Sequence, residues 1–253
     1  MPALGVASSF AVLANAAVTC TDSSISGDVG TLQSPPLGSV TQTHCPVAGS
    51  IEVGTQASSA AYAAFLDAYA GLAAQPCDQF LSGTLANVTL TPGTYCFAAA
   101  ATLTGTLTLD GPSNATWLFK VGTMGTGALT GTHFNVVMAN GGSACNVTWW
   151  VAQAATLTDS NFVGTILSGA ADTVTRGTFE GRAFAQADVT LTGAELVGCV
   201  GGTIGGGHEQ PHKAKCNQGV GNGAEGCDPG NSNHHNPSND ENGGTPGKPG
   251  RKP

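Results

Sequence analysis

Much of the chain alternates apolar and polar residues at a spacing of two, which is the pattern of a strand with one buried face. The alternation is clearest in three segments in which an apolar residue stands between two threonines: Thr156-Leu157-Thr158, Thr173-Val174-Thr175 and Thr190-Leu191-Thr192. In each segment we expect the central residue to point inward and the two Thr side chains to point outward. The pattern predicts a fold built mainly from short strands.

These segments belong to a repeat. From about residue 145 to 200 the sequence superimposes on itself with a shift of 17 residues. The repeat aligns an apolar row, an aromatic-rich row and a glycine row: Leu157, Val174 and Leu191; Phe162, Phe179 and Leu196; Gly164, Gly181 and Gly198. Consecutive turns in one register are typical of a solenoid, in which each coil stacks on the last and the rows become ladders. The glycine row is expected to mark corners.

One segment has a helical period instead. Residues 56–74 place Ala61, Phe65, Ala68 and Leu72 on one face, with Tyr62, Leu66, Tyr69 and Ala73 forming a second row beside them. Pro76 ends the run. We predict a helix at about 56–74 that packs closely against a sheet through small side chains.

The charge is low and unevenly placed. Residues 1–200 hold 11 acidic side chains and only 3 basic ones, and the whole chain has a net charge of −8. An acidic body with almost no Lys argues against nucleic acid and anionic membrane surfaces as partners. No apolar run approaches the roughly 18 residues of a membrane span.

The composition changes near residue 201. Residues 201–253 are rich in Gly, Asn, Pro and His and lack apolar periodicity. We therefore expect two parts, a solenoid over 1–200 and a flexible, disordered tail over 201–253.

Eight cysteines are spread along the chain without any CxxC spacing, which favours a disulfide framework in an oxidising compartment over a metal or thioredoxin-like site. The expected pairs are Cys20 with Cys45, Cys77 with Cys96, and Cys216 with Cys227 in the tail. Cys145 and Cys199 lie about three coils apart, roughly 14 Å on a straight line, so their pairing stays open. We expect a secreted protein whose export signal has been removed or is not part of this sequence.

Catalytic and metal-binding patterns are missing from the sequence, so we predict no enzyme activity, no cofactor and no metal site. No GxSxG, HExxH or phosphate-binding Gly loop occurs. Glu180 and Glu195 could be imagined as the acid pair of a glycan-cleaving enzyme, but they differ by 15 residues in a 17-residue repeat and should not stack.

The outward Thr pairs are the strongest functional candidates. The two Thr of a pair stand roughly 6.6–6.8 Å apart along a strand, and neighbouring coils stand roughly 4.8 Å apart. β-Branching limits their rotamers, so the result is a stiff, uncharged grid whose spacings approach those of an ice plane. Thr is also a good solvent-facing strand residue, so the grid could serve stability alone. The candidate ice-binding residues are Thr130, Thr132, Thr156, Thr158, Thr173, Thr175, Thr190 and Thr192.

Residues 4–200 also resemble the bacterial ice-binding-protein family. The resemblance is carried, in order, by Leu4-Gly5, Ser9 to Ala14, Ile25 to Gly30, Leu90 to Tyr95, Leu103 to Gly111, Trp117 to Val121, Ala144 to Trp149, Gly164 to Leu167 and Gly181 to Ala183. It implies a right-handed, triangular, parallel β-solenoid with the helix along one side and the N-terminal segment beside the last coil.

The resemblance further implies ice, or ordered water, as the partner. Asp159, Arg176 and Glu195 lie near the Thr rows, and a charged group hydrates strongly, so we expect weak or moderate ice activity. The alternative is a structural or adhesive cell-surface module that shares the fold and lacks ice activity.

Overall fold

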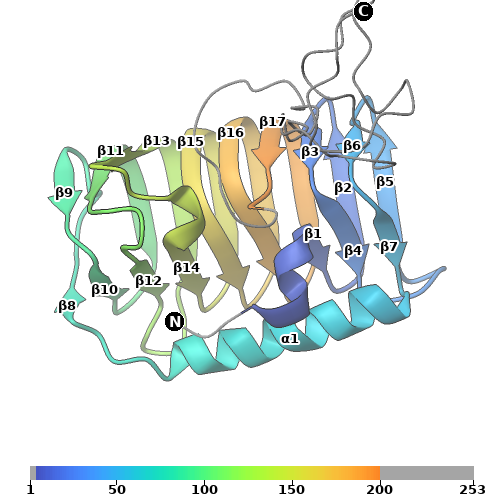
Figure 1. Cartoon of the computed structure of the whole chain (residues 1–253), viewed down its shortest axis with the longest axis horizontal. Coiled ribbons are helices and arrows are strands. Elements are labelled where there is room, and N and C mark those ends of the chain that lie inside the picture. The colour runs from blue at the N-terminus through green and yellow to red at the C-terminus, as the bar shows by residue number, and fades with distance from the viewer. Residues whose placement is uncertain (1–3, 200–253) are drawn as a thin grey trace, which may run out of the picture. The chain divides into compact units, whose positions relative to one another are not determined.

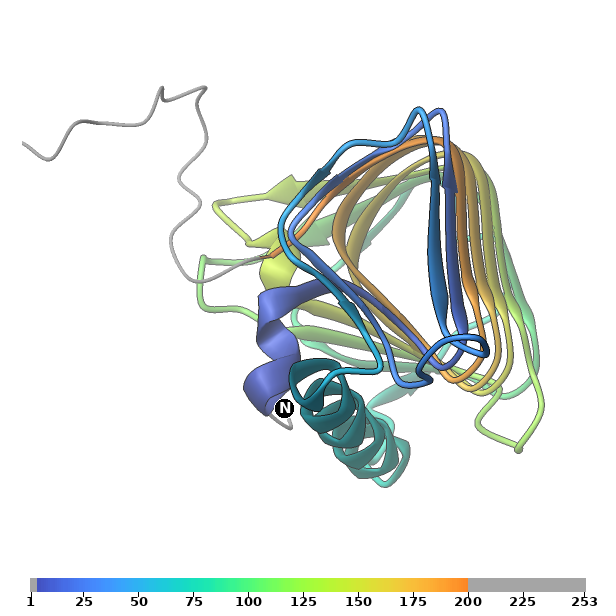
Figure 2. The same cartoon turned by 90° about the vertical axis from the view of Figure 1, so that its right-hand side faces the viewer.

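The computed structural model describes residues 4–199, which form a β-solenoid. Its 17 strands make one continuous sheet in which neighbouring strands run parallel. Figure 1 shows the coils stacked side by side, with a single long helix running beneath them. Seen from its end, the solenoid has a three-sided cross-section and the helix lies against one side (Figure 2). The fold expected from the sequence is confirmed.

Three faces run along the solenoid, and we name them the Thr face, the second face and the helix face. The Thr face consists of β2 (Ala17–Thr21), β5 (Ser39–Thr43) and the first residues of β11 (Ala101–Asp110), β13 (Leu129–Ala139), β15 (Ala155–Ser168), β16 (Asp172–Ala185) and β17 (Val189–Val197). The second face consists of the following residues of those five long strands together with β3 (Ser24–Ser26), β6 (Val47–Ala48) and β9 (Val88–Leu90).

The helix face consists of β1 (Phe10–Ala14), β4 (Asp28–Thr31), β7 (Ile51–Val53), β8 (Gln79–Phe80), β10 (Gly93–Phe97), β12 (Trp117–Val121), β14 (Val147–Val151) and the last residues of β15 and β16. Two short 3-10 helices, η1 (Gly5–Ser9) and η2 (Ala144–Asn146), complete the described elements.

The order of the coils in space differs from their order in sequence. Strands β1 to β7 wind the first coils at one end, and α1 (Gln56–Ala73) then carries the chain back along the stack to β8 at the other end (Figure 1). The remaining coils grow toward the first ones until β17 pairs with β2 and β3, and β16 pairs with β1. The N-terminal segment therefore lies beside the last coil, as the resemblance implied.

The predicted helix is α1 (Gln56–Ala73), which begins at a capping box formed by Thr55 and Ser58. Its length is roughly 27 Å at 1.5 Å per residue, which matches a stack of about six strand spacings. The expected inner row is buried, and Phe65 packs edge-on against Phe184 of the helix face. Leu66 and Ala73, placed by the sequence in the second row, are instead exposed. Each fully buried large apolar side chain stabilises the docking by about 1.5–3 kcal/mol.

An aromatic ladder fills the core between the faces. Phe119 stacks on Trp149 with ring centroids 4.0 Å apart, and Phe162 contacts both Trp149 and Phe179. Phe162 and Phe179 belong to one row of the 17-residue repeat, and they pair in the register that this repeat predicts. The interior is therefore rigid beneath the Thr face.

Gly164 and Gly181 mark one corner of the solenoid, between the second face and the helix face. Both have positive φ, and a Cβ atom at Gly181 would lie 1.9 Å from the carbonyl oxygen of Gly164. Only glycine fits there, so the corner role expected for this row is confirmed at these two positions.

Three disulfides are present among the described residues: Cys20–Cys45, Cys77–Cys96 and Cys145–Cys199. The first two are the expected pairs. Cys145 and Cys199 meet because η2 lies against β15 and β16 instead of staying in its own coil, which brings the Cα atoms to 5.5 Å. The straight-line distance considered from sequence does not apply to this pair.

The expected tail, with Cys216 and Cys227, lies outside the described residues. Within residues 4–199, no helix has the length and apolar character needed to cross a bilayer.

Candidate ice-binding face

Threonines form two unbroken columns on the Thr face. The first column runs through seven neighbouring strands, each Thr paired with the next: Thr102, Thr130, Thr156, Thr173, Thr190, Thr19 and Thr41. The second column runs two residues further along the strands: Thr132, Thr158, Thr175, Thr192, Thr21 and Thr43. The two columns make a regular grid of methyl and hydroxyl groups.

The strand pattern explains why the grid is flat. The residue between the two Thr of each strand points inward and is buried in most coils, as Leu103, Leu157, Val174, Leu191 and Cys20 are. Because these side chains are anchored in the core, the Thr on either side are held outward. Parallel pairing on both sides and the limited rotamers of Thr then fix the spacing of the grid.

All eight predicted Thr residues lie in these columns. Sequence reasoning missed Thr19, Thr21, Thr41 and Thr43 because β2 and β5 lie at the opposite end of the sequence from β17. It missed Thr102 because β11 lies before the regular part of the repeat. A usable signal was present in the two Thr-x-Thr segments of β2 and β5, spaced by 22 residues instead of 17. The grid is therefore longer than the three clean coils that the repeat indicates.

Asp159 and Arg176 lie at the edge of the Thr face and not within it. Each occupies the corner that follows the second Thr column, with φ of 50° and 57°. The Arg176 guanidinium donates to both Asp159 carboxylate oxygens, from Nε at 2.6 Å and from Nη2 at 2.8 Å. This hydrogen bonding holds the pKa of Asp159 below its ordinary value. The two charges offset each other beside the grid, so they disturb it less than two separate charges would.

The same corner holds one residue of positive φ in every coil of the Thr face: Gly105, His133, Asp159, Arg176, Gly193, Asp22 and His44. At the end nearest β5, His44 Nδ1 lies 3.1 Å from Asp22 Oδ1. Glycine adopts this conformation freely, whereas a side chain there is strained.

Beyond the corner, the second face begins with a hydrogen-bonded ladder. Asn161 donates to Asn135 at 2.8 Å, and Thr178 donates to Asn161 at 2.9 Å. Glu195 pairs with Thr178 and continues this column on β17. Unlike Asp159 and Arg176, it therefore belongs to the second face.

Glu180 and Glu195, the acid pair considered from the sequence, do not stack on one another. Glu195 pairs in register with Thr178 and Glu180 pairs with Val197, so the two glutamates stand in different columns. Among residues 4–199, no group of three or more His, Cys, Asp or Glu side chains could hold a metal ion.

Residues 12–197 match the family model described as "Ice-binding-like". The chain belongs to this ice-binding-like family. It is 37% identical over 192 residues to an ice-binding protein of a Nostoc species, an alignment that covers 72% of this chain and 68% of the relative. It is 33% identical over 207 residues to an ice-binding protein of Flavobacterium frigoris, with 74% and 73% covered.

Solved structures of ice-binding proteins share the fold of this family member. The crystal structure of the ice-binding protein from the Antarctic ascomycete Antarctomyces psychrotrophicus matches with a TM-score of 0.72 and 29% identity, covering 79% of this chain and 98% of that one. The Shewanella frigidimarina ice-binding domain matches with a TM-score of 0.70 and 30% identity, covering 78% and 96%. The family expected from the sequence is confirmed.

Proposed function

We propose that this protein binds ice through the Thr face and limits the growth or recrystallisation of ice. The observation that carries the proposal is the continuity of the two Thr columns, which pass without a gap from β17 to β2. The proposed binding residues are the eight Thr named from the sequence together with Thr19, Thr21, Thr41, Thr43 and Thr102.

The physical basis is a rigid surface of low charge. Thr methyl groups exclude water locally while the hydroxyl groups hold water at fixed intervals of roughly 4.8 Å across the strands. Such a face can order a water layer that merges with the ice lattice. Stacked aromatic rings and the Cys20–Cys45 disulfide, which starts from β2 of the Thr face, keep the face from deforming when it adsorbs.

The action needs no chemical step, so the proposal includes no catalytic residue, cofactor or metal. The partner is the ice surface or its ordered water. Three disulfides among the described residues favour an oxidising location, and we place the protein outside the cell.

Partition into a slowly growing ice hemisphere tests the proposal. The full chain should be enriched in the ice fraction, whereas a non-binding globular protein of similar size should stay in the liquid. If the fraction of the chain found in the ice is as low as that of the control protein, the proposal is overturned. Exclusion from ice combined with binding to cell walls or glycans would instead support an adhesive surface module.

A further inference from the structure

The Thr face crosses a junction between parts of the chain that are far apart in sequence. On one side lies β17, the last coil, and on the other lies β2, which carries Thr19 and Thr21. Backbone pairing across this junction is supplemented by Ala17, whose N–H donates to the Asp188 carboxylate at 2.9 Å. The position of the N-terminal Thr pairs therefore depends on how firmly the first coils dock on the last.

Arg182 is a buried cation that bridges both ends of the described chain. It lies on β16, is only 7% exposed, and donates from Nη2 to the carbonyl oxygen of Ser8 at 3.0 Å and from Nε to the same oxygen at 3.2 Å. Nη2 also donates to the carbonyl oxygen of Cys199, and Nη1 lies 3.5 Å from the Thr165 hydroxyl. Burial lowers the pKa of Arg182 to about 10, so the side chain stays protonated at neutral pH.

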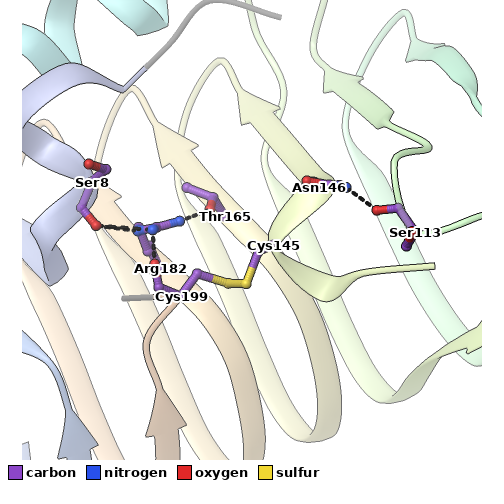
Figure 3. The surroundings of a disulfide bond; sticks show 7 residues. All are labelled: Ser8, Ser113, Cys145, Asn146, Thr165, Arg182 and Cys199. Atoms are coloured by element: carbon purple, nitrogen blue, oxygen red, sulfur yellow. Dashed lines mark hydrogen bonds between the residues drawn. A yellow bond between two sulfur atoms is a disulfide. The ribbon is translucent and has the colours of Figure 1, made fainter. Parts of the chain in front are cut away.

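A disulfide fixes one of these acceptors. Cys199 follows β17 and is joined to Cys145 of η2, so its carbonyl oxygen cannot move far from the guanidinium group (Figure 3). Figure 3 shows Ser8, Arg182 and Cys199 gathered in one place, with Thr165 on the neighbouring strand. The guanidinium group thus ties the segment before β1 to the segment after β17.

We propose that Arg182 and the Cys145–Cys199 disulfide form a clasp that positions the N-terminal Thr pairs in register with the rest of the ice-binding face. Arg182 is a positioning residue in this scheme, because it contacts the segments before β1 and after β17 and does not touch the ice. The predicted effect of the clasp on ice activity rests on the proposed function. The docking of β1 and β2 can be measured without ice.

Lys120 provides a matched control. It is also a buried cation on the helix face, and its ammonium group donates to the carbonyl oxygens of Ala73 and Gln75 at 2.8 and 2.6 Å. Those contacts hold the C-terminal end of α1 and do not involve the junction. Arg182→Met and Lys120→Met therefore remove the same kind of interaction from two different places.

The experiment measures amide hydrogen exchange and thermal hysteresis for both variants in the full chain. Exchange at β1 and β2 should rise at least tenfold in Arg182→Met, exchange at β13 and β15 should stay unchanged, and Lys120→Met should leave β1 and β2 protected. A rise spread evenly over all strands, or no rise at β2, would overturn the clasp. If Arg182→Met does not fold, the Cys145→Ser/Cys199→Ser variant gives the same two readouts.

A double-variant comparison tests the link to ice. Thr19→Tyr should lower thermal hysteresis in the otherwise native chain and should add little loss in the Arg182→Met background, where Thr19 is already displaced. An equal loss in both backgrounds would contradict the positioning role. Exclusion of the native chain from ice would refute the proposed function, and the exchange result would still decide the clasp.

Discussion

Thr190 and Thr19 are paired neighbours on the Thr face, although one belongs to the last strand of the described chain and the other to the second. Their pairing joins the coils that build up from β8 to the coils formed by β1 to β7. As a result, thirteen paired Thr side chains share one flat surface that no single stretch of sequence encodes.

The corner pair should modulate ice activity through its net charge. Removing Arg176 alone, as Arg176→Gly, leaves Asp159 unpaired next to Thr158 and should lower thermal hysteresis severalfold, because a lone carboxylate hydrates strongly. The double variant Asp159→Gly/Arg176→Gly reproduces the residue found at Gly105 and Gly193 in the same corner. It should match or exceed the native chain, since it removes both the charge and two strained positions. Equal activity of the single and double variants would contradict this account.

Asp172 should make stability depend on pH. It is 1% exposed and lies between Ala155 and Val189 in one inward-pointing row. Neither carboxylate oxygen has a hydrogen-bond partner among the described residues. Burial raises the pKa of Asp172 to about 8. The Ser168 hydroxyl donates to the Ala170 carbonyl oxygen, so it leaves the carboxyl group without a donor.

The direction of the pH effect follows from the raised pKa of Asp172. The protonated acid is favoured in the folded chain, so its contribution to stability is complete below about pH 4, the ordinary pKa of an unfolded Asp, and is lost as the pH rises through about 8. The loss should approach about 1.4 kcal/mol per pH unit over that window. Asp172→Val should remove this slope and raise the free energy of unfolding at pH 7 by on the order of 3 kcal/mol.

Denaturant unfolding at pH 5 and pH 8 measures the effect at Asp172, with Asp172→Asn as the control that keeps the shape and cannot titrate. Both variants should lose the slope, and only Asp172→Val should gain stability at both pH values. A slope that persists in Asp172→Asn would place the titrating group elsewhere.

Phe65 should carry much of the docking energy of α1. It is fully buried and contacts Tyr62 on the helix and Phe184 on β16. Phe65→Ala should lower the free energy of unfolding by about 3–5 kcal/mol, whereas Leu66→Ala, at the exposed neighbouring position, should change it by about 0.5 kcal/mol or less. Thermal unfolding of both variants checks this, and similar losses would mean that the helix is held mainly by its termini.

The repeat was sufficient to predict the register of β15, β16 and β17, because one period governs both the core and the surface there. It could not place Thr19 and Thr41, since their coil follows a different period and reaches β17 only through tertiary docking. It also did not show that Asp159 turns away from the grid, because the enrichment of Asp and His at positive φ is only a weak signal for a corner, and Arg176 in the next coil carries no such signal. The Cys145–Cys199 pair escaped prediction because η2 leaves the coil that the repeat describes.

The most direct test of the central claim compares two Tyr substitutions of outward-facing Thr residues. Thr173→Tyr places a bulky ring in the middle of the first Thr column, and Thr108→Tyr places the same ring on the second face of β11. Thermal hysteresis and recrystallisation inhibition should fall at least tenfold in Thr173→Tyr and stay near the native values in Thr108→Tyr. Equal activity of the two variants, or loss in Thr108→Tyr alone, would contradict the assignment of ice binding to the Thr face.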